Sequence, residues 1–274
     1  MIQDYINYLL NIRGYSSHTA NSYRKDLEHF THWMQKNIEG ARWSTITRDI
    51  IDQYVTAQAQ QGLAPATTNR RLAAISGLYN YMKRQGYEVD NPCRFESRRK
   101  QVQTVPNTIP VADLKRAYEQ AGGVTKVMIG LLATTGMRIQ ELLDLKYEDI
   151  DFNENSIRVS GKGKKERIVY TTATILETLL AVRTYYGASG KIFIFDQRQA
   201  RYMIWQALKE VSNARQLSPH AIRHTVATNM ATHGANVTTI AQILGHKRIE
   251  TTQRYIDMTQ ANVRQACQQY SLFN

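Results

Sequence analysis

Apolar side chains recur at three- and four-residue spacing through most of residues 1–88, and this spacing predicts helices. Ser16 is a suitable N-cap for one of them. Pro65 and Gly86 flank a later apolar stripe over residues 67–84, as helix start and stop signals do. A bundle of four or five helices is therefore expected at the N-terminus.

The second half of the chain mixes two periods. Alternation with a period of two over residues 156–160 and 166–170, on either side of Gly-Lys-Gly-Lys-Lys, predicts a β-hairpin with a cationic tip. The expected fold class is mainly α with a small β-hairpin or sheet (α+β). Helical spacing covers residues 111–120, 125–145, 174–186, 198–214, 219–233, 239–244 and a segment around Tyr255.

Between these halves the periodicity stops. Residues 89–109 contain Pro92, Pro106 and the basic run Arg98-Arg99-Lys100, and they predict a linker. The basic run is either a solvated surface or a segment that lies along a phosphate backbone. We therefore expect two domains, residues 1–88 and 110–274, a division that suits a chain of 274 residues.

The charge indicates a polyanionic partner. The formal net charge is +12 and the isoelectric point is near 9.7. Residues 1–88 carry a net charge of +3 and residues 108–274 a net charge of +7, so both domains are basic. Charge alone does not separate DNA from RNA or from an acidic membrane surface.

Several classes of protein are excluded by composition. Two cysteines, Cys93 and Cys267, cannot build a disulfide framework or a four-thiolate zinc site. The longest strictly apolar run, residues 127–133, has seven residues and cannot cross a bilayer. The N-terminus lacks the pattern of a secretory signal. No membrane association and a cytoplasmic location are expected.

Two motifs that often hold cofactors are incomplete. His220 and His224 are four residues apart on one predicted helix, but Ala221 stands where a zincin has glutamate, so no metal is expected. The tip at residues 161–165 lacks the spacing and the hydroxyl of a phosphate-binding loop, so no nucleotide cofactor is expected. A lysine hairpin of this kind either follows a DNA groove or serves solubility.

Two arginines lie in otherwise apolar segments. Arg138 precedes a predicted helix, and Glu141, three residues later, is placed to orient its guanidinium. His220 and Arg223 share one face in the first turns of a helix that Ser218 caps, where the helix dipole favours an anion. A pair of guanidinium groups suits phosphoryl chemistry, although each alone is more often an ion-paired surface residue.

The order of these residues carries the strongest signal. Thr-Gly-Met precedes Arg138, Lys162 stands in Gly-Lys-Gly, and His220-x-x-Arg223 is followed by Leu-Gly-His246 and by Tyr255 nine residues later. This series resembles the tyrosine recombinase (phage integrase) family, most closely its compact Xer-like members, over essentially the whole chain. Met137 and Ile222 replace leucines that the family often has, at no chemical cost.

The resemblance implies a reaction and the roles of its residues. Tyr255 would attack a phosphodiester and hold a 3′-phosphotyrosine, with Arg138 and Arg223 binding the phosphate oxygens. His220 would act as base, His246 would bind an oxygen, Lys162 would protonate the leaving 5′ oxygen, and Glu141 would orient Arg138. Because the covalent link conserves the bond energy, the resemblance implies no cofactor and no metal.

The resemblance also implies partners. The expected substrate is double-stranded DNA with paired inverted half-sites, on which a homotetramer exchanges strands through a Holliday junction, with a possible second recombinase or accessory proteins. Residues 1–88 would be the helical, SAM-like core-binding domain. An apolar stripe near the C-terminus is expected to dock either on its own domain or on a neighbouring protomer; it comprises Val263, Ala266, Cys267 and Tyr270.

Two other classes share part of this signal. The type IB topoisomerases use a similar constellation to nick and reseal one duplex. The other alternative is a non-catalytic DNA-binding protein descended from a recombinase. The presence of a suitable residue at all six candidate catalytic positions argues against it.

Overall fold

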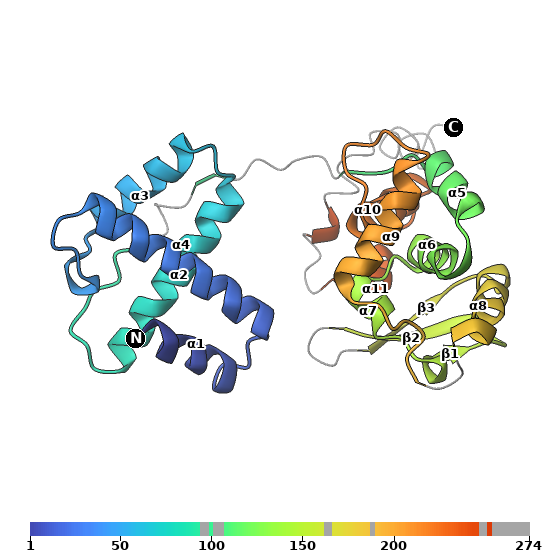
Figure 1. The fold of residues 1–274 in the computed structure, drawn as a ribbon, viewed down its shortest axis with the longest axis horizontal. Helices are drawn as coiled ribbons and strands as arrows, with labels where there is room; N and C mark the ends of the chain where they lie inside the picture. Colours follow the sequence, from blue (N-terminus) through green and yellow to red (C-terminus); the bar gives the residue numbers. More distant parts are fainter. Residues whose placement is uncertain (94–98, 101–106, 162–165, 187–189, 247–250, 254–274) are drawn as a thin grey trace, which may run out of the picture. The chain divides into compact units, whose positions relative to one another are not determined.

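The computed structural model comprises two compact units, Met1–Gln103 and Thr104–Asn274 (Figure 1). It describes the chain except for residues 94–98, 101–106, 162–165, 187–189, 247–250 and 254–274. The prediction of a mainly helical fold with a small antiparallel sheet is confirmed. No helix in the described ranges is long and apolar enough to cross a membrane.

The first unit is a bundle of four helices, drawn in blue to cyan in Figure 1. Ser16 caps the second helix by accepting a hydrogen bond from the Thr19 amide, and Pro65 occupies the first turn of the fourth. Fully buried aromatic and aliphatic side chains, among them Phe30, Tyr54 and Leu78, form the core. The helices are α1 (Ile2–Asn11), α2 (Ser17–Asn37), α3 (Arg48–Gln60) and α4 (Pro65–Arg84).

The segment between residues 88 and 110 forms hydrogen bonds with helices of the two units. Arg99 exchanges backbone hydrogen bonds with the Asn69 side chain on α4, at 2.9 Å in both directions. Ile109 is 1% exposed, and its amide donates to the Thr225 hydroxyl at 2.8 Å. Residues 99 and 109 of the predicted linker are therefore each held by hydrogen bonds to a helix, α4 and α10 (Pro219–Thr232) respectively.

The second unit packs its helices around α6 (Gly123–Thr135). Residues 127–132 of this helix are all buried, because α5, α8, α9 and α10 lie against it. The remaining helices are α5 (Val111–Gln120), α7 (Ile139–Leu143), α8 (Ala173–Tyr186), α9 (Gln197–Lys209), α10 (Pro219–Thr232) and α11 (Val237–Leu244).

A three-stranded antiparallel sheet lies beside these helices, in the order β1 (Ile150–Asp151), β2 (Ser156–Ser160), β3 (Glu166–Tyr170). Strands β2 and β3 pair with Val159 opposite Arg167. Strand β3 packs against both α6 and α11. Strand β3, which follows residues 162–165 in sequence, therefore lies next to α11.

The structure corrects three predicted elements. The single helix expected over residues 125–145 is divided, because Gly136 adopts φ +61° and ends α6. A Cβ at this position would lie 2.7 Å from the Leu244 side chain, so only glycine allows α11 to approach. The two-residue strand β1 was not expected, and α9 ends at Lys209 rather than at residue 214.

Candidate active site

Arg138 and Glu141 form one unit at the start of α7. Arg138 is the N-cap residue, and its amide donates to Glu141 Oε2 at 2.8 Å. Its guanidinium Nη1 donates to Glu141 Oε1 at 2.7 Å. The Arg138 side chain is 44% exposed, whereas that of Glu141 is 6% exposed. The buried carboxylate thus orients a guanidinium that reaches solvent, in agreement with the i, i+3 spacing.

Arg167 on β3 is the second partner of the same carboxylate, and sequence analysis missed it. Its Nη2 lies 2.7 Å from Glu141 Oε2 and its Nη1 lies 3.1 Å from Oε1. One signal was present: alternation along β3 puts Arg167 on the same face as the buried Val169. An arginine on the core side of a strand indicates a buried acceptor.

These arginines control the ionisation of Glu141. Burial by itself raises the pKa of this carboxyl group. Hydrogen bonds and the charge of Arg167, together with the hydrogen bonds from Arg138, outweigh burial and hold the pKa below its ordinary value. Glu141 therefore remains a carboxylate at neutral pH and neutralises part of the positive charge of the two guanidinium groups.

Arg223 lies on the buried side of α10, only 3% exposed. Its Nη1 donates to the Gly136 carbonyl at 2.7 Å, and its Nη2 donates to the Leu244 carbonyl at 2.6 Å. The guanidinium thus joins the end of α6 to the end of α11. Such hydrogen bonds are what a buried charge requires.

The turn after α11 brings these groups together. Arg138 Nη2 donates to the Gly245 carbonyl at 3.2 Å, one residue beyond the carbonyl that Arg223 contacts. His246 follows directly, and its Nδ1 forms a 2.7 Å hydrogen bond with the fully buried hydroxyl of Thr252. Two arginines more than eighty residues apart in sequence therefore converge on the turn that carries His246.

His220 and His224 lie in the first turns of α10, which Ser218 caps and Pro219 opens as predicted. Their ring centroids are 4.2 Å apart in an edge-on arrangement. His220 is exposed, whereas His224 is buried. No group of three or more histidine, cysteine or acidic side chains suited to a metal occurs in the parts of the chain that the structure describes.

Two of the sequence-predicted residues, Lys162 and Tyr255, lie outside the described residues. The nearest described residues before them in sequence are Gly161, which follows β2, and Gln253, which follows the buried Thr252.

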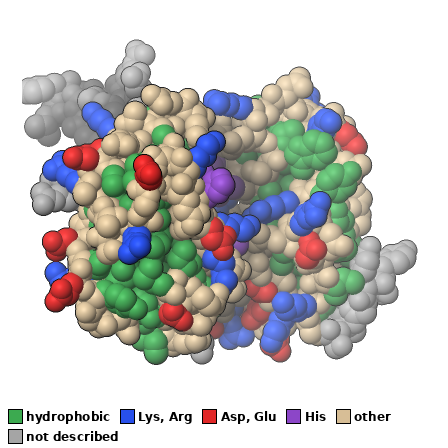
Figure 2. Space-filling model, turned by 60° about the vertical axis from the view of Figure 1, so that its left-hand side comes forward, with side chains coloured by type: hydrophobic (Ala, Val, Ile, Leu, Met, Phe, Trp, Pro, Cys, Tyr) green, Lys and Arg blue, Asp and Glu red, His purple; other side chains and the backbone are tan. Residues whose placement is uncertain are grey.

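On the face drawn in Figure 2, Lys and Arg side chains lie among acidic and apolar ones rather than in one continuous block.

Chemically, this arrangement suits an anion with several oxygens. Guanidinium groups bind phosphate oxygens in pairs, and a histidine beside them can donate a further hydrogen bond. Arg138, Arg223 and His246 converge on one turn, while His220 lies at the start of the helix that carries Arg223.

Two family models match this chain. Residues 108–262 match the model of the phage integrase family, and residues 2–86 match the phage integrase N-terminal SAM-like domain. The tyrosine recombinase XerD of Listeria monocytogenes is 27% identical over 98% of this chain and 98% of its own length. The tyrosine recombinase XerC of Herpetosiphon aurantiacus is 30% identical over 93% of this chain and 89% of its own.

A solved structure shares the fold. The XerH site-specific recombinase bound to palindromic difH substrate, in a post-cleavage complex, superposes with a TM-score of 0.76. It is 19% identical, over 90% of this chain and 78% of that one. The two proteins therefore share one fold.

The chain belongs to the phage integrase family. It is a site-specific tyrosine recombinase, an enzyme that breaks and rejoins DNA. Membership of this family favours the recombinase interpretation of the sequence over the type IB topoisomerase interpretation.

Proposed function

We propose that this recombinase cuts each strand by attack of Tyr255 on a phosphodiester and exchanges strands through a Holliday junction. The observation that carries the proposal is the convergence of Arg138 and Arg223 on the turn that bears His246. The Tyr255 oxygen bonds to phosphorus, the bond from phosphorus to the 5′ oxygen breaks, and a 3′-phosphotyrosine and a free 5′-hydroxyl result. Attack by another strand's 5′-hydroxyl reverses these bonds, so no nucleotide cofactor is consumed.

Each side chain has a defined part in this step. Tyrosine has a pKa of about 10, so roughly one phenol in a thousand is ionised at pH 7, and the phenolic proton must be removed. His220 accepts that proton, and His246 donates to a non-bridging oxygen. Arg138 and Arg223 stabilise the charge of the five-coordinate phosphorus. Glu141 orients Arg138, as its two hydrogen bonds to that residue favour.

Lys162 is assigned the general acid role, which gives a test. Lys162→Ala is expected to slow cleavage of ordinary DNA about a hundredfold, within the range of general acid catalysis. The same variant should cleave a substrate with a 5′-thio leaving group at a rate close to wild type, because a thiolate departs without protonation. Single-turnover cleavage of both substrates measures this. An equal loss on both would remove Lys162 from the acid role.

The proposed partner is double-stranded DNA with paired inverted half-sites, acted on by four protomers. The XerH neighbour is bound to a palindromic substrate, which supports a two-fold arrangement of half-sites. Residues 1–88 serve as the core-binding domain and residues 110–274 as the catalytic domain, and both are basic, as contacts with phosphates favour. Because the substrate is genomic or mobile duplex DNA, we place the enzyme in the cytoplasm.

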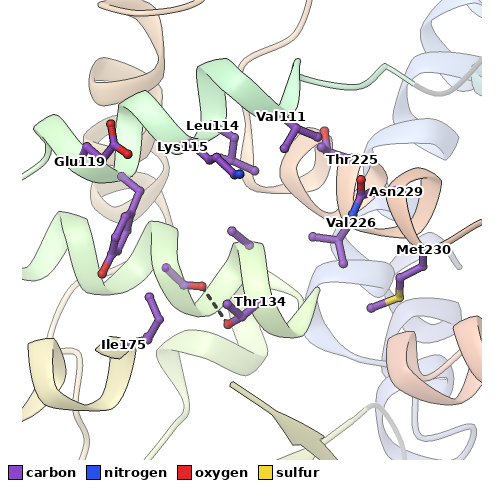
Figure 3. Close-up of a pocket in the computed structure, with 13 residues that line it drawn as sticks. Val111, Leu114, Lys115, Glu119, Thr134, Ile175, Thr225, Val226, Asn229 and Met230 are labelled. Atoms are coloured by element: carbon purple, nitrogen blue, oxygen red, sulfur yellow. Dashed lines mark hydrogen bonds between the residues drawn. The ribbon is translucent and has the colours of Figure 1, made fainter. Parts of the chain in front are cut away.

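Assembly would use a groove of about 360 Å³ in the second unit (Figure 3). Helices α5, α6, α8 and α10 line it with mainly apolar side chains. The hydroxyl of Thr134, one of the polar lining residues, donates a hydrogen bond to the Gly130 carbonyl of its own helix at 2.9 Å. We assign this groove to the C-terminal stripe of a neighbouring protomer. The stripe's i, i+3, i+4, i+7 spacing supplies an apolar helical face, the form of ligand that such grooves take.

Charges placed on either surface test this docking. Met230→Glu in the groove and Tyr270→Glu in the stripe are each expected to leave binding to a single site unchanged and to abolish four-protomer assembly on two sites. Burial of an unpaired carboxylate in an apolar groove opposes docking. Sedimentation of the protein–DNA complex measures it. Gln265→Glu, off the stripe by helical spacing, is the control, and normal assembly of both groove and stripe variants would contradict the assignment.

The experiment for the reaction itself begins with the target. Binding sites are selected from a random DNA pool, and the selected site is prepared as a nicked duplex from which the fragment beyond the cut diffuses away. Wild-type protein is expected to accumulate a covalent complex with this duplex, stable in denaturant. A bound site without any covalent complex would contradict the proposed function.

A further inference from the structure

We propose that Arg167 is a positioning residue for strand cleavage, which acts by orienting Arg138 and the turn that carries His246. This inference rests on the proposed function. Arg167 is not among the residues that the sequence resemblance assigned a role. Its contacts connect three segments of the site.

The guanidinium of Arg167 bridges two segments. Nη1 and Nη2 hold both oxygens of Glu141, at 3.1 and 2.7 Å, and Nε donates to the Ile243 carbonyl at 2.7 Å. The side chain is 13% exposed, so these charge-assisted bonds are only weakly screened by solvent. Only arginine offers three donors in this fixed plane, because lysine has a single nitrogen.

Arg138 depends on the same carboxylate. Arg138 donates two hydrogen bonds to Glu141, and its Nη2 donates to the Gly245 carbonyl. Two guanidinium groups therefore flank one carboxylate and contact carbonyls two residues apart at the end of α11. Loss of one guanidinium group would leave the Glu141 carboxylate free to rotate towards the remaining one.

The turn itself is shaped around Arg167. Gly245 has φ +63°, and a Cβ there would lie 3.0 Å from Arg167 Nη1 and 3.2 Å from its Cζ. The guanidinium therefore lies flat against the backbone of the residue that precedes His246. Any other residue at this position would displace the guanidinium or the turn.

Arg167 also links the turn to the lysine hairpin. It is the second residue of β3, which follows residues 162–165 directly, and Val159 of β2 lies opposite it. The Arg167 side chain thus connects β3, the strand that follows Lys162 in sequence, with two other parts of the site. These are the end of α11 next to His246 and the Glu141 carboxylate that accepts hydrogen bonds from Arg138. This connection is the arrangement expected of a residue that sets relative positions within a site.

Single-turnover cleavage of the selected nicked duplex tests the inference. Arg167→Gln is expected to bind this DNA within twofold of wild type but to cleave it about a hundredfold more slowly, the cost of a misplaced catalytic group. Arg167→Lys keeps the charge but cannot bridge Glu141 and Ile243. Its cleavage rate is therefore expected to stay below a tenth of the wild-type rate. Full recovery by lysine would show that charge alone matters and would overturn the proposal.

The pH profile separates positioning from a general structural defect. In wild type the arginines hold the pKa of Glu141 down, so the carboxylate persists as pH falls. Arg167→Gln removes a charge and the strongest of the hydrogen bonds that lower this pKa, so the pKa of Glu141 is expected to be higher in the variant than in wild type. The cleavage defect should therefore deepen as pH is lowered from 8 to 6, because a protonated Glu141 no longer accepts both bonds from Arg138. A defect of constant size over this range contradicts the inference.

A double variant shows whether Arg167 acts through Glu141. If it does, Glu141→Gln combined with Arg167→Gln should cleave about as slowly as Glu141→Gln alone, rather than at the product of the two losses. Independent, multiplicative losses would overturn the proposed route. Thermal unfolding of each variant, with Arg167→Lys as the milder change, establishes that the compared proteins are folded.

Arg158→Gln is the matched control. Arg158 lies on the other face of the same sheet, where it pairs with Ile168 of β3. Its side chain is exposed and forms a 3.5 Å ion pair with Asp149. This variant is expected to cleave at the wild-type rate at every pH. If wild type forms no covalent complex, the proposed function fails; if wild type cleaves and Arg167→Gln cleaves equally fast, only the present inference fails.

Discussion

Tyr255→Phe is expected to abolish the covalent complex with a nicked target duplex while leaving binding to that duplex intact. The substitution removes the oxygen that is proposed to attack phosphorus, and a phenyl ring cannot form the covalent bond. The phenyl ring otherwise keeps the size of the side chain. Denaturing electrophoresis measures the complex, and a mobility shift measures binding.

A tyrosine outside the site provides the control. Tyr170 lies on β3 and is 66% exposed. Tyr170→Phe should form the complex at the wild-type level. If Tyr255→Phe still formed the complex, another residue would be the nucleophile, and the assignment of roles around Arg138 and Arg223 would have to be redrawn.

Arg223→Gln is the second substitution with a large expected effect, a loss of cleavage of about a hundredfold to a thousandfold. Removal of one preorganised donor to a developing negative charge costs that much in other enzymes. Arg223 in addition joins the Gly136 and Leu244 carbonyls, so its loss also loosens the contact between α6 and α11. Single-turnover cleavage at saturating protein measures the chemical step apart from binding.

The structural part of this loss can be separated from the chemical part. Arg223→Lys retains a positive charge but cannot span two carbonyls with one nitrogen, so it should remain at least tenfold impaired. Arg116→Gln is the matched control, because Arg116 is exposed on α5 and contacts Asp113 and the Val211 carbonyl. Wild-type cleavage by Arg223→Gln in a folded, DNA-bound protein would remove Arg223 from the phosphate site.

Local sequence patterns predicted what local forces determine. The hairpin strands at 156–160 and 166–170 and the helix at 111–120 agree with the structure, because alternation and helical spacing report burial directly. The Ser218 cap and Pro219 start are also correct, since both depend only on adjacent backbone groups. The contact between Arg138 and Glu141 follows from their spacing in one helix turn.

Long-range contacts escaped the sequence. Gly136 ends α6 in a left-handed conformation, and a Cβ there would lie 2.7 Å from the side chain of Leu244, more than a hundred residues later. Arg167 is tied to Glu141 and Ile243 by tertiary packing of β3 against α11, which no spacing rule encodes. The convergence of Arg138 and Arg223 on one turn is of the same kind. A resemblance in motif order indicated which residues meet, but it did not indicate what holds them in place.

The measurement that tests the central claim most directly is identification of both products of cleavage on the selected nicked duplex. The covalent complex is digested and the DNA-linked peptide is sequenced by mass spectrometry, and the end of the released strand is analysed chemically. We expect a peptide joined through Tyr255 to a 3′-phosphate, and a released strand that ends in a 5′-hydroxyl. A link through another residue, or through a 5′-phosphate, would contradict it.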